Sequence, residues 1–334
     1  MKTLLLLASA LLLLTPTVWA QSRTGTVTLH VDLSAQTPGE PARLWLPYPV
    51  SDAQQTITAI RQSGDYATSA VYTDTINGTP MLYAEWPASA KSRRLDLQFT
   101  VQRQEVRLAA FAETEPKWNP ADYADYLGAT SLGPIDGEVK LLADKIVKGK
   151  TTVLQKARAI YDWIVENMHR DEKTIGCGKG DVCLLLQKPG GKCTDISSVY
   201  VALCRAAGVP AREIFGLRLG KKAQEDITGW QHCWAEFFLP GSGWVPVDPA
   251  DVRKAMLKED LKLEDARTQE LRAYYWGGLD AYRFRLAVGR DLILNPPQAG
   301  APLNTFGYPY AEVGGKPLDF YNAKSFVYSI NFSE

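Results

Sequence analysis

Apolar and polar residues alternate one by one along the first part of the chain. The alternation is clearest over residues 26–31, 43–47 and 95–101, and Asn77-Gly78 is a dipeptide typical of a β-hairpin turn. Alternation gathers the apolar side chains on one face of a strand, and a second sheet must then cover that face. Residues 21–110 are therefore predicted to form an all-β domain, with a sandwich as the expected architecture.

Proline and glycine break the pattern after this domain. Residues 111–137 contain Pro116, Pro120, Gly128, Gly133, Pro134 and Gly137. Proline lacks a backbone N–H and glycine lacks a Cβ, so this density of both interrupts any long helix or strand. We interpret residues 111–137 as a linker between two domains.

Beyond the linker, apolar residues recur every three to four positions, which is the period of a helix. One apolar stripe predicts a helix over residues 151–169, with Thr151 or Thr152 as its N-cap. A second stripe predicts a helix over residues 193–207, which a glycine and then a proline bring to an end. Both helices have one apolar face, so both are expected to pack against a core.

The period changes back to that of strands after the second helix. Three strands and a further helical stretch are predicted over residues 212–219, 231–239, 243–248 and 251–275. Helices followed by a run of strands indicate an α+β domain. We assign residues 138–280 to this domain and residues 281–334, which return to short strands, to a C-terminal β extension.

The first twenty residues have the composition of a secretory signal peptide. Lys2 supplies a positive charge, residues 4–14 are apolar, and Val18 and Ala20 are the small residues expected before a cleavage site. A membrane anchor is the alternative, but the apolar run is about half of the ~20 residues that cross a bilayer. Residues 1–20 are thus predicted to be removed, which leaves a periplasmic or secreted protein without a membrane span.

Composition and charge limit the classes of partner. Of 334 residues, 46% are hydrophobic and 22% are charged, which is typical of a globular chain and not of a disordered or fibrous one. The 37 Lys and Arg residues equal the 37 Asp and Glu residues, so no overall field attracts a polyanion. A nucleic-acid partner is therefore not expected.

Cys193 lies at a position that activates a thiol. It follows Gly190-Gly191-Lys192 at the predicted start of the second helix. Free N–H groups and the positive end of the helix dipole favour the thiolate there, and the charge of Lys192 acts in the same direction. Cys193 is therefore the candidate nucleophile; the alternative is a small buried residue or a disulfide partner.

A thiol nucleophile requires a base, and the chain has 3 histidines. His30 lies in the β domain, and His169 ends the first helix, where the helix dipole is sufficient to account for it. His232 lies on the strand before a tight turn centred near Gly241. That turn brings Asp248 opposite residues 233–235, within reach of His232.

Asp248 is accordingly the candidate that orients the His232 ring by accepting its second N–H. Glu236 is a weaker candidate, because four residues along a strand place it about 13 Å from His232. A purely structural role is the alternative for both members of the pair. A strand histidine is often a satisfied polar group, and an aspartate before a proline, as at Asp248-Pro249, is common in turns.

Four short motifs occur in order between residues 140 and 250. They are GKCTD at residues 191–195, LCRAAGVPAR at 203–212, HCWAE at 232–236 and GWVPVDP at 243–249. Together they resemble the core of the transglutaminase-like superfamily, and four linked motifs are far more specific than any one of them. The resemblance implies a papain-like thiol triad with Cys193 as nucleophile, His232 as base and Asp248 as orienting residue. It also implies a helix that carries the cysteine and packs on an antiparallel sheet.

The superfamily includes protein-crosslinking transglutaminases, peptidases and amidases, so the resemblance fixes the chemistry better than the substrate. It implies that an amide acyl group of a peptide or protein passes to Cys193 as a thioester. We favour hydrolysis of that thioester; crosslinking to a lysine amine is the first alternative, and a non-catalytic binding or assembly protein is the second. Trp163 is a candidate donor to the oxyanion, although core packing is the favoured role for it.

No cofactor or metal site is predicted. The sequence has no Asp-rich loop of the EF-hand type, and no two cysteines stand two residues apart as in zinc fingers. The 5 cysteines are an odd number in an oxidising compartment. We expect a disulfide between Cys177 and Cys183 and an apolar packing role for Cys204, and we leave open whether Cys204 and Cys233 pair.

Overall fold

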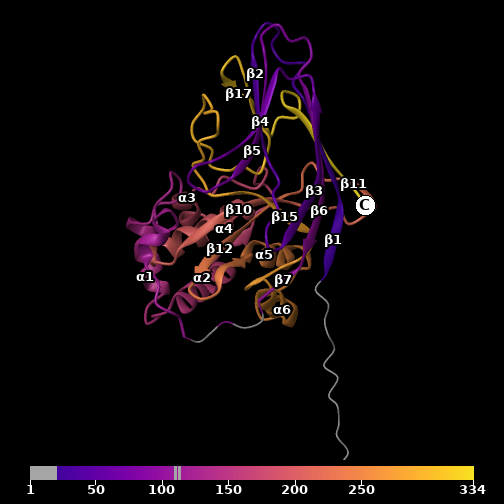
Figure 1. Ribbon diagram of the computed structural model, residues 1–334. Helices are drawn as coiled ribbons and strands as arrows, with labels where there is room; N and C mark the ends of the chain where they lie inside the picture. Colours follow the sequence, from indigo (N-terminus) through magenta and orange to yellow (C-terminus); the bar gives the residue numbers. More distant parts are fainter. Residues whose placement is uncertain (1–20, 109–110, 112–113) are drawn as a thin grey trace, which may run out of the picture.

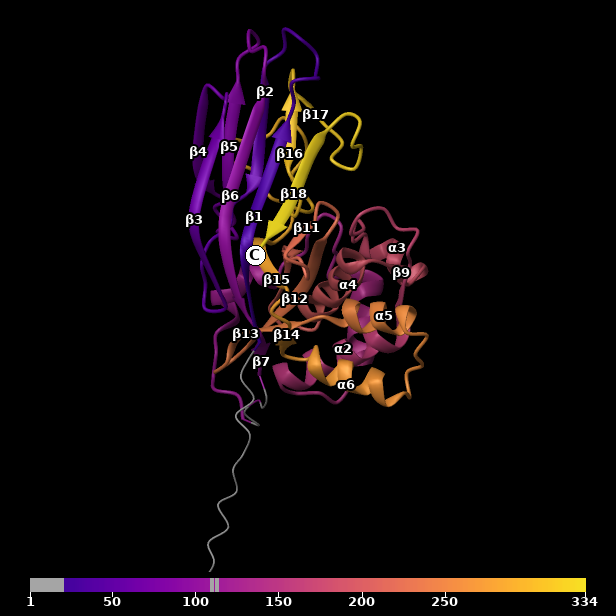
Figure 2. The same ribbon diagram turned by 90° about the vertical axis from the view of Figure 1, so that its right-hand side faces the viewer.

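The computed structural model describes residues 21–108, 111 and 114–334, so the predicted signal peptide lies outside the described residues. The chain forms a β-sandwich at one end and a lobe of helices and strands at the other (Figure 1). The helices gather on one side of that lobe, away from the long sandwich strands (Figure 2). The α+β class predicted from the sequence is confirmed.

Two five-stranded sheets form the sandwich, with the orders β3-β6-β1-β18-β11 and β4-β5-β2-β16-β17. The N-terminal residues supply β1 (Ser22–Asp32), β2 (Ala42–Pro47), β3 (Gln55–Gly64), β4 (Thr68–Thr73), β5 (Pro80–Trp86) and β6 (Arg94–Gln104). Later residues supply β11 (Gln224–Asp226), β16 (Tyr310–Val313), β17 (Lys316–Pro317) and β18 (Val327–Ser333). Val31, Leu44 and Phe99 are buried in the core between the sheets, as their alternating positions require.

The two ends of the described chain meet in one sheet. β1 lies between β18 and β6, with Val27 opposite Phe332 on one side and opposite Phe99 on the other. Within residues 281–334, β18 joins one sandwich sheet, β16 and β17 join the other, and β15 (Arg283–Val288) joins the sheet of the second lobe. The predicted C-terminal extension is therefore distributed over three sheets.

The second lobe is built on a four-stranded antiparallel sheet with the order β13-β12-β10-β15. β10 (Ala211–Arg218), β12 (Gln231–Leu239) and β13 (Gly243–Val247) agree with the predicted strands to within one residue. α4 (Cys193–Ala206) packs across β12 and β10, and every one of its residues is buried. The helix begins at the predicted residue and is the centre of this lobe.

The remaining predicted helices are present with one difference. α2 (Val153–Asn167) begins with a capping box, in which the Thr152 hydroxyl oxygen accepts the backbone N–H of Gln155 at 3.2 Å. The helical stretch predicted over residues 251–275 is two helices, α5 (Pro249–Lys258) and α6 (Ala266–Tyr274). They are separated where Asp260 adopts a left-handed backbone conformation with φ of 51°.

Several short elements are additions to the sequence prediction. They are α1 (Gly137–Ile146), α3 (Val182–Gln187), the 3₁₀ helix η1 (Pro120–Tyr126) and the strands β7 (Val106–Arg107), β8 (His169–Arg170), β9 (Gly190–Gly191) and β14 (Gly278–Leu279). η1 lies inside the predicted linker, because a proline is tolerated at the first position of a helix. The ring of Tyr123 in η1 stacks on Phe238 of β12 with 4.0 Å between centroids, which ties this segment to the second lobe.

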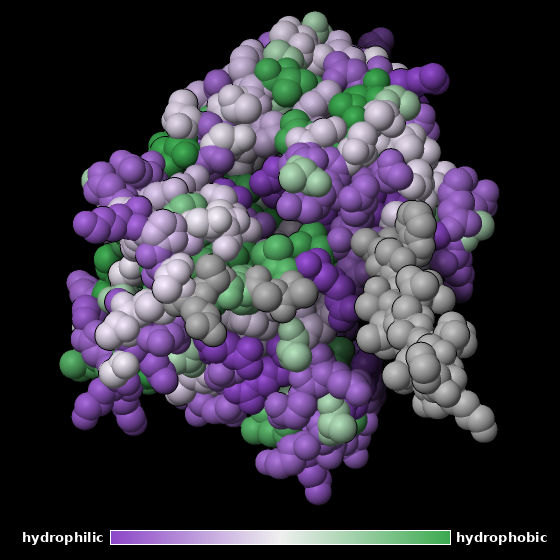
Figure 3. All heavy atoms as spheres, turned by 60° about the horizontal axis from the view of Figure 1, so that its bottom comes forward, coloured by the Kyte–Doolittle hydropathy of each residue, from purple (hydrophilic) through white to green (hydrophobic). Residues whose placement is uncertain are grey.

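Within the described ranges 21–108, 111 and 114–334, no helix has both the length and the apolar character needed to cross a bilayer. On the face drawn in Figure 3, hydrophilic and hydrophobic side chains are interspersed.

Candidate active site

Cys193 is the first residue of α4, and a short parallel pair of strands, β8 and β9, leads the chain to that point. Gly191 in β9 is required by close packing, because a Cβ there would lie 2.4 Å from the Cβ of Asp195. The Asp195 carboxylate accepts the backbone N–H of Lys192 at 3.0 Å, which closes the first turn of the helix. Cys193 thus lies at the N-terminus of a buried helix, where the dipole stabilises a thiolate.

His232 is the second residue of β12, and Asp248 holds its ring. β12 and β13 pair with Ala235 opposite Val247, so Asp248 is level with residue 234, inside the predicted range of 233–235. The Nε2 atom of His232 lies 2.7 Å from one oxygen of Asp248. The other oxygen accepts the backbone N–H of Asp251 at 2.9 Å and caps α5. The carboxylate is therefore fixed on both sides, and so is the ring.

The surroundings of Cys193 favour its thiolate. Hydrogen bonds from the thiols of Cys177 and Cys233, followed by the hydrogen bond and charge of His232, hold the pKa of Cys193 well below its usual value. Burial acts in the opposite direction but is outweighed. Because Nε2 of His232 is directed at Asp248, Nδ1 is the ring nitrogen left to interact with the Cys193 thiol.

The surroundings of His232 favour its protonated form. Burial and the charge of Arg218 act to lower the pKa of His232, but the attraction of Asp248 and Asp251 is stronger, so the pKa is raised. A raised imidazole pKa beside a lowered thiol pKa favours a thiolate–imidazolium pair at neutral pH. This is the ionisation state that a thiol nucleophile requires.

A buried set of charges, which we call the carboxylate–guanidinium network, surrounds the Asp248 side of the ring. It consists of Asp248, Asp251, Asp280, Arg218 and Arg283. Arg283 is fully buried and pairs with all three carboxylates, while Arg218 lies 2.6 Å from Asp251. Three carboxylates face two guanidiniums, so the network becomes neutral when His232 carries a positive charge. Because uncompensated buried charge is costly, the network favours the imidazolium.

Arg283 also limits which hydrogen bonds Nε2 of His232 can make. Its Nη1 atom lies 2.9 Å from Nε2 and also bonds the same Asp248 oxygen. A guanidinium N–H can only donate, so this approach is a contact between two donors that share one acceptor. Arg283 cannot donate to Nε2 while Nε2 donates to Asp248, and Nδ1 is therefore left for Cys193.

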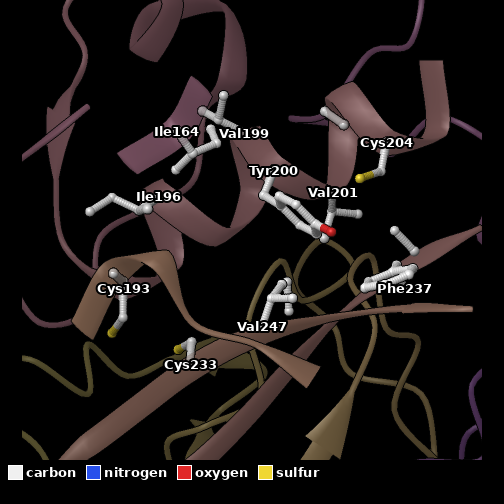
Figure 4. Close-up of a cluster of buried hydrophobic side chains, with 14 of the residues drawn as sticks. Ile164, Cys193, Ile196, Val199, Tyr200, Val201, Cys204, Cys233, Phe237 and Val247 are labelled. Carbon is white, nitrogen blue, oxygen red and sulfur yellow. The ribbon is translucent and has the colours of Figure 1, made fainter. Parts of the chain in front are cut away.

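Two further thiols flank Cys193. The Sγ atoms of Cys177, Cys193 and Cys233, which we call the sulfur cluster, lie within 4.8 Å of one another, and all three residues are buried. Figure 4 shows the sulfurs of Cys193 and Cys233 facing each other between the start of α4 and β12. The Tyr308 hydroxyl donates to Sγ of Cys177 at 3.3 Å, and Oγ1 of Thr194 lies 3.2 Å from Sγ of Cys233.

The predicted disulfide between Cys177 and Cys183 is wrong, because both residues are free thiols. The carbonyl of Cys177 accepts the backbone N–H of Thr194 at 2.9 Å, which holds this loop against the start of α4 and turns the thiol inward. Cys183 lies on α3 and is exposed. Cys204 and Cys233, whose pairing the sequence left open, are free as well; Cys204 is fully buried in the core along α4.

The thiol and the ring open onto a cleft of about 1120 Å³, which Cys177, Cys193 and His232 line. Basic side chains form one part of the remaining lining: Arg170, Lys192, Arg218, Lys221, Lys254, Lys258 and Arg267. Aromatic side chains form another: Trp230, Tyr275, Tyr282, Tyr308, Phe320, Tyr321, Phe326 and Tyr328.

The cleft carries an excess of positive charge, although the whole chain is neutral. Arg170 pairs with Glu172, and Arg267 pairs with Glu259. In the described part of the chain, no ion pair involves the four lysines of the cleft. These lysines therefore leave a local positive field at the entrance to the site.

Trp163, a candidate second donor to the oxyanion for which core packing was the favoured role, does not line this cleft and packs against the core. The sequence did not predict that Cys177 and Arg283 belong to the site. Cys177 reaches it through the bend of its loop, and Arg283 reaches it from a strand beyond the predicted end of the domain. Neither placement has a local pattern that could have indicated it.

Comparisons with known proteins show which family the chain is similar to. Residues 140–249 match the family model described as the transglutaminase-like superfamily. An uncharacterised protein of Haemophilus influenzae is 41% identical over 310 residues, which cover 85% of this chain and 84% of the relative. An uncharacterised protein of Bacillus subtilis is 28% identical over 125 residues, which cover 33% of this chain and 17% of that protein.

Among solved structures, a proposed cysteine protease from Cytophaga hutchinsonii has a similar fold. The TM-score is 0.52 with 18% sequence identity, and the match covers 94% of this chain and 100% of that one. At this identity the likeness extends to the fold of both lobes and not to the substrate.

Proposed function

The chain belongs to the transglutaminase-like superfamily, and on that premise we propose that it is an exported thiol enzyme acting on an amide bond of a peptide or protein. The observation that carries the proposal is the placement of Cys193 at the start of α4, beside a His232 ring that Asp248 holds at 2.7 Å. All three residues are nearly or fully buried, and two of them line the cleft. Export rests on the leader at residues 1–20.

The geometry supports a double-displacement mechanism. The Cys193 thiolate attacks the amide carbonyl carbon, a C–S bond forms, and an electron pair moves to the oxygen. The backbone N–H of Cys193, at the helix start, is placed to stabilise that oxyanion. Nδ1 of His232 gives its proton to the leaving nitrogen as the C–N bond breaks, and a thioester remains.

The second half of the reaction returns the enzyme to its starting state. His232, now neutral, takes a proton from water, and the resulting hydroxide forms the new C–O bond while the C–S bond breaks. The products are a carboxylic acid and the regenerated thiolate–imidazolium pair. Asp248 keeps the ring oriented in both halves. We propose hydrolysis as the main outcome; a lysine amine in place of water would give a crosslink.

The first experiment measures the reactivity of Cys193 against a thiol of the same chain. The reduced protein is treated with iodoacetamide at pH 6, and peptide mass mapping gives the alkylation rate of each cysteine. An ordinary thiol, with a pKa of about 8.5, is almost fully protonated at this pH. We expect Cys193 to react at least about tenfold faster than the exposed Cys183.

The matched variant is His232→Ala. It should slow alkylation of Cys193 and leave that of Cys183 as it is, because only Cys193 faces the ring. A Cys193 that reacts no faster than Cys183 would sink the proposal of an enzyme. Ammonia release from a glutamine peptide, measured with and without an added amine, then separates hydrolysis from crosslinking.

A further inference from the structure

The sulfur cluster contains two thiols that the proposed reaction does not need. A thiol triad uses one sulfur, yet Cys177 and Cys233 place their Sγ atoms within 4.8 Å of Cys193 and of each other. The three residues come from different parts of the lobe: a loop, the start of α4 and the strand β12. Their convergence therefore requires the folded chain, and no spacing in the sequence indicates it.

The spacing of the sulfurs suits one kind of ligand. A metal ion bound by three thiolates in a plane, with metal–sulfur distances of about 2.3 Å, requires sulfurs about 4.0 Å apart. The limit of 4.8 Å leaves only a small adjustment to reach that arrangement. In the described part of the chain the sulfur cluster has three donor atoms, because no further His, Cys or carboxylate atom lies within 4.8 Å of all three sulfurs.

Charge and access also favour an ion bound as a thiolate complex. A monovalent ion with three thiolates has a charge of −2, and the positive end of the α4 dipole faces that charge. Lys192 and Lys254 line the same cleft. Cys177 and Cys193 also line it, so an ion can reach the cluster from solvent.

We propose that Cys177, Cys193 and Cys233 form a binding site for a soft, thiophilic metal ion, with the cuprous ion as its preferred occupant. Soft thiolate donors select Cu(I), and three sulfurs without a fourth donor suit it better than zinc, which takes four ligands. Binding forms three Cu–S bonds, and each thiol that binds releases its proton to solvent. No electron is transferred, because copper enters and stays as Cu(I).

The site would control the proposed enzyme, since Cys193 cannot be a metal ligand and a nucleophile at the same time. This consequence rests on the proposed function, but the binding itself does not. Cys177 and Cys233 would hold the ion over the thiolate, so that loss of the ion restores the nucleophile. The chain would thus be active in its metal-free form and silent when it carries Cu(I).

The test titrates Cu(I) anaerobically into the reduced, metal-free protein in competition with a chromophoric Cu(I) chelator. We expect one ion per chain, together with a thiolate-to-copper charge-transfer band in the ultraviolet. The double variant Cys177→Ser/Cys233→Ser should bind Cu(I) at least about 100-fold more weakly, because two of three ligands are lost. The control Cys183→Ser removes an exposed thiol outside the cluster and should bind as the parent does.

Three outcomes would overturn the site. One is a double variant that binds as tightly as the parent; another is equal weakening in Cys183→Ser; the third is tighter binding of Zn²⁺ than of Cu(I) in the same assay. Circular dichroism and thermal unfolding of each variant show whether it has folded. If Cys193 proves unreactive towards iodoacetamide while one Cu(I) still binds, the proposed enzyme fails and the metal site stands.

Discussion

The two sides of the His232 ring are built from opposite kinds of chemistry. On one side, the sulfur cluster holds three neutral or singly charged thiols with long, weak hydrogen bonds of 3.2 to 3.5 Å. On the other side, the carboxylate–guanidinium network holds five charged groups with contacts such as the 2.6 Å pair of Arg218 and Asp251. The sulfur side can change its protonation and its ligands, whereas the charged side is fixed.

This difference suggests a division of labour in the site. The hydrogen bonds to a reacting sulfur must break and re-form in each turnover, so strong hydrogen bonds to it would slow the reaction. The base must keep one orientation and one tautomer throughout, so strong bonds to it are useful. Substitutions on the charged side should therefore cost more than those on the sulfur side, and the following predictions test that ordering.

The largest effect is expected for Asp248→Asn. The amide carries no charge to support an imidazolium, and by donating to Nε2 it favours a neutral ring with its proton on Nδ1, which cannot take the proton of the Cys193 thiol. We expect turnover on a peptide substrate to fall by about 10³- to 10⁴-fold, with alkylation of Cys193 at pH 6 reduced as well. A loss of less than tenfold would show that Asp248 does not orient the ring.

Arg283→Met should have the next largest effect, and it should appear as instability. The substitution keeps much of the side-chain volume but leaves three carboxylates, two of them buried, with one guanidinium. Breaking a buried ion pair in this way costs about 3 to 5 kcal/mol of unfolding free energy. Urea unfolding followed by fluorescence gives the value directly.

The control for this variant is Arg285→Met on the same strand. Arg285 pairs with Asp52 at 3.0 Å and its side chain is 25% exposed, so solvent replaces the lost partner. A loss of about 1 kcal/mol or less is expected. Equal losses for the two variants would contradict the special role of the network.

Acid should unfold the chain through the charged side. Burial acts to raise the pKa of Asp251, but Arg218, followed by His232 and Arg283, outweighs it and holds the pKa well below its usual value. The pKa of Asp280 is also lowered, with Arg283 outweighing burial. A carboxyl whose folded pKa is depressed stabilises the fold above its unfolded pKa, about 3.9, and loses that contribution as the pH falls through the folded value.

These two carboxylates should therefore stabilise the fold fully at pH 5 to 7. Below about pH 4 that stabilisation should be lost progressively, and the urea midpoint should fall with it. Asp280→Asn should flatten this decline, because one of the two titrating groups is gone. Cys177→Ala, on the sulfur side, should leave the slope between pH 4 and pH 2 as it is in the parent. If the urea midpoint fell more steeply with pH in Asp280→Asn than in the parent, the pKa of Asp280 would be raised and not lowered by folding.

The smallest effect concerns the solvent side of the site, where lysines line the cleft. A local positive field should raise the rate of alkylation by the anion iodoacetate relative to that by neutral iodoacetamide. In Lys254→Gln/Lys258→Gln the ratio of the two rates at Cys193 should fall roughly threefold, and 0.5 M salt should reduce it in the parent. Lys145→Gln, on the distant helix α1, is the matched control. An unchanged ratio in the double variant would show that these lysines do not select anionic ligands.

The sequence was sufficient wherever the structure is local. The apolar stripes placed α2 and α4, and the short turn after β12 fixed the register that brings Asp248 to His232. The apolar face of a helix and the pairing register of a hairpin both depend on residues a few positions apart, so both can be derived from a single sequence.

The sequence was insufficient wherever distant segments meet. The loop of Cys177 bends because Gly178 has φ of +93°, and a Cβ there would lie 1.9 Å from an Asp195 oxygen. Two nearby cysteines with a short loop between them predicted a disulfide, but this bend gives Cys177 a different neighbour. Arg283 is another example, because only the pairing of β15 with β10 carries it into the charged network.

The pairing of β1 with β18 sets the order in which the site can mature. In the first sandwich sheet, β1 gains its second neighbour only when residues 327–333 have joined residues 26–32. Tyr308, Phe320 and Tyr328, which belong to the aromatic part of the cleft, come from the same late stretch. During synthesis, the segment with Cys193, His232 and Asp248 emerges from the ribosome well before that wall does. The chain therefore carries its proposed nucleophile through the synthesis of more than a hundred further residues before the aromatic part of the cleft exists.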